Sequence, residues 1–133
     1  MSLHKSVGVL KYTEKPGNLR VIVDPGLADY YRSLIPKSSV ANKPMYPPHI
    51  SVIRKEPTPI LTDCWGKYDG QEVEFEYSTE IHSGKVYYWL NAFCLKLEEI
   101  RTELGLPVST EFTRPPDGYV KCFHITLANS KKL

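Results

Sequence analysis

The chain has 133 residues, of which 41% are hydrophobic and 24% are charged, and its formal net charge is +2 at neutral pH. A chain of this length suits one domain with a core of its own, so we expect a single domain over residues 1–133. The small net charge argues against a large nucleic-acid footprint, which needs a strong basic stripe. The three cysteines lack CxxC spacing, which argues against a zinc ribbon, and their odd number argues against a disulfide framework.

The sequence also argues against a membrane protein. No apolar run approaches the roughly 18 residues that a membrane-spanning helix needs. The first residues lack the apolar centre of a signal peptide. We therefore expect a cytoplasmic protein with no membrane partner.

Hydrophobic patterning in the first half predicts two strands, a helix and a third strand. The first two strands flank a Pro-Gly turn signal and are expected to form an antiparallel pair. Asp24-Pro25 provides a helix N-cap followed by proline at the first helical position, and Pro36 ends the helix. A polar, proline-rich loop then leads to the third strand. The expected bounds are 7–12 and 19–23 for the pair, 25–34 for the helix, 36–48 for the loop and 49–54 for the third strand.

The second half predicts the same order of elements. Alternating glutamates and apolar residues indicate a strand that is wet on one side, and a turn containing His82 leads to a returning strand. Trp89, in the middle of that returning strand, is expected to lie in the core. A helix that ends at Gly105, a loop and a last strand follow. The expected bounds are 72–80 and 86–90 for the pair, 92–104 for the helix, 106–119 for the loop and 121–128 for the last strand.

Two short segments at equivalent places in the halves share the pattern histidine, apolar residue, hydroxyl, apolar residue. They are His49-Ile50-Ser51-Val52 and His124-Ile125-Thr126-Leu127. Side chains alternate between the faces of a strand, so each histidine shares a wet face with its hydroxyl, while the apolar neighbours face a core. We therefore expect an α+β domain with a pseudo-two-fold axis. Its two β-β-α-β halves are expected to form antiparallel sheets that line a central cleft.

Two imidazoles and two hydroxyls facing one cleft suit the cleavage of a phosphodiester. One histidine of the pair His49 and His124 would act as general base and the other as general acid. The Ser51 and Thr126 hydroxyls would donate hydrogen bonds to the non-bridging phosphate oxygens. This chemistry requires no metal and no cofactor, and the pattern does not say which histidine is the acid.

Cationic and aromatic residues near the motifs are candidates for binding the substrate. The cations would neutralise phosphate charge, and the aromatic rings would stack on bases. The candidate cations are Arg54, Arg114 and Lys121, and the candidate rings are Tyr12, Tyr46 and Tyr119.

A zinc site is an alternative use of the histidines. Cys122 shares the strand face of His124, so Cys122, His124 and His49 are possible ligands. This alternative is less favoured, because it leaves both hydroxyls without a role and offers no obvious fourth ligand.

The paired motifs, in two halves with the same element order, resemble the 2H phosphoesterase superfamily. The resemblance implies metal-independent cleavage of phosphodiesters in cyclic nucleotides or RNA termini, with both histidines and both hydroxyls in one cleft. The small size and the context of residues 46–56 are similar to the phage anti-CBASS phosphodiesterases, which degrade the cyclic di- and trinucleotide signals of bacterial antiphage defence. This similarity implies attack of a ribose 2′-hydroxyl on the adjacent 3′–5′ bond, contact of Tyr12 with the ligand, and action in the host cytoplasm.

Two other functions remain open at this point. The same side chains suit an RNA 2′,3′-cyclic phosphodiesterase that processes RNA ends. A catalytically silent module that binds a cyclic nucleotide or another small phosphodiester is also possible, although both motifs are intact.

Overall fold

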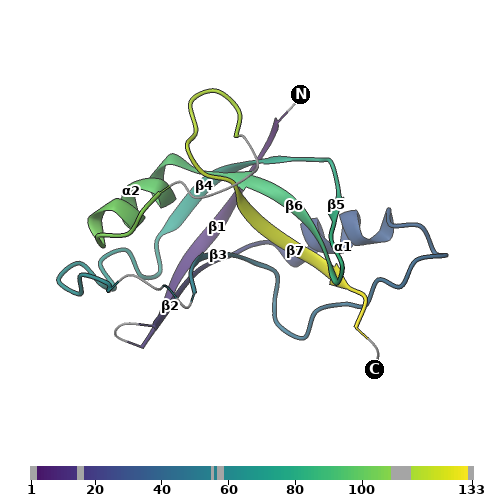
Figure 1. Cartoon of the computed structure of the whole chain (residues 1–133), viewed down its shortest axis with the longest axis horizontal. Helices are drawn as coiled ribbons and strands as arrows, with labels where there is room; N and C mark the ends of the chain where they lie inside the picture. The colour runs from purple at the N-terminus through teal and green to yellow at the C-terminus, as the bar shows by residue number, and fades with distance from the viewer. Residues whose placement is uncertain (1–2, 15–16, 55, 57–58, 109–114, 132–133) are drawn as a thin grey trace.

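The computed structural model describes residues 3–14, 17–54, 56, 59–108 and 115–131 (Figure 1). Strand, strand, helix, strand is the order of elements in the first half, and the second half repeats it with one additional short strand. The domain is therefore α+β, as expected. The elements are β1 (Leu3–Glu14), β2 (Gly17–Ile22), α1 (Pro25–Ser33), β3 (His49–Ile53), β4 (Glu72–Ser78), β5 (His82–Ser83), β6 (Tyr87–Phe93), α2 (Leu95–Glu103) and β7 (Phe123–Asn129).

The strands of the described part form one antiparallel sheet of seven strands. Their order is β4-β1-β2-β3-β7-β6-β5, and β4 also pairs with β6, so the sheet curls back on itself. The sequence led us to expect separate sheets on either side of a cleft. Instead, the two halves are joined into one sheet, because β3 pairs with β7 and β1 pairs with β4. The two motif strands are therefore direct neighbours.

The core lies on the apolar side of this curled sheet, and both helices contribute to it. Ile50 and Ile125, the residues between histidine and hydroxyl in each motif, are fully buried and pair with each other. Burial of a side chain of this size contributes about 2 kcal/mol to folding. Tyr31 of α1 and Ile100 of α2 belong to the same core. The buried isoleucines fix the opposite face of β3 and β7 as the one that carries the histidines.

The start of each helix shows which local signals decide a boundary. α1 begins as expected, with the Asp24 carboxylate accepting a hydrogen bond from the Gly26 backbone N–H at 2.9 Å. α2 begins at Leu95, later than expected, because β6 continues through Phe93 and pairs there with β4. None of the helices in the described residues is long and apolar enough to cross a membrane.

Candidate active site

The two motifs come together in a crossed arrangement. β3 and β7 pair antiparallel through the isoleucine that follows each motif histidine. Continuing that register by one residue in each direction places His49 opposite Thr126 and Ser51 opposite His124. Directly opposed side chains on an antiparallel pair have their β-carbons about 5 Å apart. In this register each histidine is opposite the hydroxyl-bearing position of the other motif, and it shares a face with the hydroxyl of its own motif.

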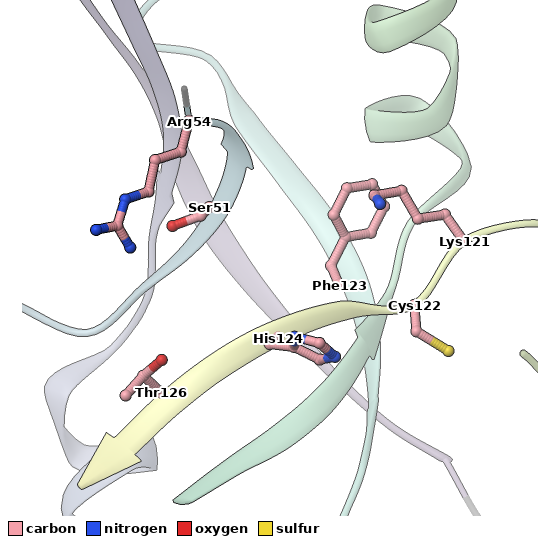
Figure 2. Close-up of a pocket in the computed structure, with 7 residues that line it drawn as sticks. All are labelled: Ser51, Arg54, Lys121, Cys122, Phe123, His124 and Thr126. Atoms are coloured by element: carbon pink, nitrogen blue, oxygen red, sulfur yellow. The ribbon is translucent and has the colours of Figure 1, made fainter. Parts of the chain in front are cut away.

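A pocket of about 270 Å³ opens beside these side chains (Figure 2). Figure 2 shows Arg54 on the same side of the pocket as Ser51, and Lys121 next to Phe123. Among the described residues, the lining contains these two cations and no carboxylate, so this part of the pocket is suited to an anion. His49 is not among the described residues that line the pocket, and the extended register places it opposite Thr126. The lining residues are Ser51, Arg54, Lys121, Cys122, Phe123, His124 and Thr126.

The surroundings of His49 favour its neutral form. Its Nδ1 lies 2.8 Å from the carbonyl oxygen of Pro47, which can only accept, so Nδ1 carries the hydrogen. In the neutral ring the lone pair is then on Nε2. Burial lowers the pKa of His49, the hydrogen bond to Pro47 opposes this, and the charges of Arg20 and Arg54 lower the pKa further. A neutral histidine with a bare Nε2 is equipped to accept a proton at neutral pH.

Arg20 belongs to the site although the sequence analysis did not identify it. It lies on β2, directly opposite Ser51, and its guanidinium lies 5.8 Å from the centre of the Tyr46 ring. Its neighbours Leu19 and Val21 are fully buried, so strand alternation alone would have turned Arg20 outward. Only the pairing of β2 with β3 brings it beside the motif. Tyr46 itself is 63% exposed and is not among the described residues that line the pocket.

Trp89 was expected in the core, and that prediction was wrong. Leu90 is fully buried, so its neighbour Trp89 faces the other side, opposite Thr126. The indole lies 5.5 Å from the His124 ring and is stacked with the His82 ring at 5.9 Å. An aromatic residue in contact with a motif histidine is thus one that the sequence analysis assigned to the interior.

The structure does not bring Tyr12 or Tyr119 to this pocket. Tyr12 is paired with the buried Leu19, so its ring faces the core side, and burial raises its pKa. The Tyr119 hydroxyl donates a hydrogen bond to Glu76, and its ring packs on Phe93 at 5.4 Å. Strand pairing therefore decides the position of Tyr12, whereas Tyr119, in the loop before β7, packs against side chains of β4 and β6. Arg114, another expected contact, lies outside the described residues.

Helix α2 holds the chain where it leaves the first motif and where it enters the second. The buried Arg101 donates from Nη1 to the carbonyl of Val52 at 2.8 Å and also binds the Glu56 carboxylate. The buried Glu98 accepts hydrogen bonds from the backbone N–H groups of Val120 and Lys121, at 2.9 and 3.1 Å. Helix α2 therefore fixes the end of β3, which leads to Arg54, and the segment with Lys121 just before β7.

Helix α1 makes an equivalent contact with the second motif. Arg32 donates from Nη1 to the carbonyl of Leu127 at 3.4 Å. Val52 and Leu127 are each the last residue of a motif, so an arginine from the helix of one half binds the same position in the motif of the other half. The two motif strands are thus held in a reciprocal way.

The zinc alternative finds no support in the described part of the chain. Among those residues, no three histidine, cysteine, aspartate or glutamate side chains are grouped so that they could hold a metal ion. His49, Cys122 and His124 therefore do not form the expected ligand set.

Comparison with known protein families, with curated proteins and with solved structures gives no match to this chain. Its function is therefore inferred from the geometry of the site.

Proposed function

We propose that this protein is a metal-independent phosphodiesterase of the 2H type that cleaves 3′–5′ bonds in cyclic di- or oligonucleotides. The observation that carries the proposal is the direct antiparallel pairing of β3 with β7 at Ile50 and Ile125. Extending this register by one residue opposes His49 to Thr126 and Ser51 to His124, on the face away from the core. His124 and both hydroxyls then line one anion-sized space, and His49 is the proton-transfer group on the strand beside it. The transfer of a phosphoryl group from one oxygen to another requires this set of groups.

The two histidines divide the proton transfers. His49, with Nε2 bare, removes the proton from a ribose 2′-hydroxyl, and the resulting oxygen attacks the adjacent phosphorus. His124, as imidazolium, gives its proton to the 5′-oxygen as the P–O5′ bond breaks. The products are a 2′,3′-cyclic phosphate end and a 5′-hydroxyl, and the two rings have exchanged protonation states. Ser51 and Thr126 donate to the non-bridging oxygens as charge is redistributed between them.

The pseudo-two-fold arrangement of 2H enzymes is part of the proposal. Support comes from the repeated element order and from the reciprocal contacts of Arg32 with Leu127 and of Arg101 with Val52. A duplicated half that carries its own motif explains why each helix binds the other half's motif at the same position.

The proposed substrate is small, and the proposed setting is a phage that counteracts bacterial CBASS defence. A pocket of about 270 Å³ with Arg54 and Lys121 in its lining is better matched to a compact phosphodiester than to a long polyanion. The net charge of +2 supports the same choice. The defence role follows from the resemblance in sequence around the first motif.

Product analysis tests the function. The purified protein is incubated in EDTA with a 3′,3′-cyclic dinucleotide and, separately, with an RNA that ends in a 2′,3′-cyclic phosphate. The proposal expects linear products from the cyclic dinucleotide, a turnover lowered by about 10² to 10⁴ with His124→Ala, and full turnover with His4→Ala, a histidine on β1 outside the site.

Each other outcome points to a different function. Opening of the RNA 2′,3′-cyclic phosphate with an untouched cyclic dinucleotide would replace the proposal by RNA end processing. Tight binding of the cyclic dinucleotide without any product, in both wild type and His124→Ala, would make the protein a binding module.

A further inference from the structure

Trp89 lies between two histidines of the sheet, one of which belongs to a motif. Its strand, β6, is flanked by β7 with His124 and by β5 with His82. The ring centres of Trp89 and His124 are 5.5 Å apart with 51° between their planes, and those of Trp89 and His82 are 5.9 Å apart with 21° between them. The contact with His124 is thus made by an indole that is itself supported from the far side.

Hydrogen bonds fix the orientation of that indole. Its Nε1–H donates to Oδ1 of Asn91 at 3.2 Å, and the Asn91 amide nitrogen lies 3.2 Å from Nε2 of His82. Because an indole can only donate, Oδ1 is the acceptor, and Nδ2 then donates to a bare His82 Nε2. Asn91 is only 7% exposed, so this amide is not free to turn. A β-carbon at Gly84 would lie 3.3 Å from the indole, so the glycine leaves room for the ring.

Several cationic groups of the described residues lie around His124, and the Glu98 carboxylate binds the backbone of Lys121. Arg54 and Lys121 line the same pocket, Arg20 lies opposite Ser51 one strand further away, and His49 lies on the neighbouring strand. Glu80 is 4.0 Å from His82 Nε2, on the far side of Trp89. Positive neighbours disfavour an imidazolium. The electron-rich face of an indole favours one.

We propose that Trp89, held by Asn91 and His82, is a positioning residue that fixes the His124 ring and favours its imidazolium form. The use of that imidazolium as the general acid rests on the proposed function. The pocket cations bind phosphate but disfavour a positive charge on His124. The indole thereby offsets this effect, and His124 keeps the proton that it donates. In the described part of the chain, no aromatic ring is found in contact with the His49 ring, so the two histidines have different surroundings.

The test is an NMR titration of the His124 ring in the resting protein. In Trp89→Leu the midpoint of the His124 titration is expected to fall by about half a pH unit or more, since cation–π contacts are worth that much. Trp89→Phe, which keeps a ring but loses the bond to Asn91, should give a smaller fall in the same direction and covers the case in which Trp89→Leu does not fold. Tyr87→Leu is the matched control, because Tyr87 is an exposed ring on the same strand that contacts Lys131.

A His124 midpoint that does not move in either Trp89 variant, or that moves equally in Tyr87→Leu, overturns the inference. In a turnover assay, the alkaline limb of the pH–rate profile should move to lower pH together with the midpoint of the His124 titration. A merely structural loss of activity would lower the rate without moving this limb. The titration needs no substrate. If wild-type protein cleaves nothing, the proposed function fails while the titration still decides the role of Trp89.

Discussion

The two motifs have the same chemistry in sequence but different surroundings in the fold. His49 is half-buried and bound through Nδ1 to the Pro47 carbonyl, which leaves Nε2 bare. His124 is exposed at the pocket and lies against the Trp89 indole. A duplicated pattern can supply two identical groups, but the proposed base and acid must differ. The surroundings make this difference: the Pro47 carbonyl, in the loop before β3, binds His49, and Trp89 of the neighbouring strand β6 lies against His124.

The arginines that hold the two motif strands differ in the same way. Arg101 is 5% exposed and binds Val52 and Glu56. Arg32 is more accessible, and its carboxylate partner, Asp29, is half exposed. The first motif strand is therefore held from the interior, and the second from nearer the surface.

The largest effect is expected from removing a histidine. His49→Ala and His124→Ala should each lower turnover by about 10² to 10⁴, since each removes one proton transfer. The double variant should be little worse than either single one, because the two groups act as a unit. Steady-state rates on the cyclic dinucleotide measure this. A loss of only a few-fold in either single variant would remove that histidine from the mechanism.

The two arginines provide the next comparison. Arg101→Met leaves the Glu56 carboxylate and the Val52 carbonyl without their partner, so the free energy of unfolding should fall by about 3 to 5 kcal/mol. Arg32→Met should cost about 1 kcal/mol or less, because its ion pair is near the surface. Urea denaturation of both variants measures the difference. Equal losses would show that the two strands are held alike.

The hydroxyls come third. Ser51→Ala and Thr126→Val each remove one donor to the phosphate while keeping the shape of the side chain, and each should lower turnover by about 10². Substrate affinity should change less than turnover if the bonds strengthen in the transition state. Measuring kcat and KM separately checks this, and a change confined to KM would make the hydroxyls binding groups only.

The smallest effect concerns the pKa of His49. Its value is lowered by burial first and by the nearby positive charges, so Arg20→Gln should raise it. If His49 is the base, as proposed, the acidic limb of the pH–rate profile, where His49 becomes protonated, should then move to higher pH. Lys11→Gln is the matched control, because Lys11 lies opposite Arg20 but one strand further from His49. A limb that moves equally in both variants, or to lower pH in Arg20→Gln, would contradict this account.

Much of the fold could be predicted because its signals are local. Asp24-Pro25 started α1, and the alternation around Ile50 and Ile125 placed both isoleucines in the core. The start of α2 could not be predicted, because pairing with β4 keeps Phe93 in a strand. The position of Trp89 was predicted wrongly because its hydrophobicity favours the interior. Its neighbour Leu90 faces the core and is fully buried, so Trp89 faces the other side of the strand.

The sequence by itself determined which four side chains share a wet face, since strand alternation turns His49 with Ser51 and His124 with Thr126 to one side. Only the tertiary structure decided which side chains lie next to these four. The pairing of β3 with β7 crossed each histidine with the other hydroxyl, the pairing of β2 with β3 brought in Arg20, and that of β6 with β7 brought in Trp89. The physical reason is that alternation is a property of one strand, whereas a neighbour depends on which strands bury their apolar faces together.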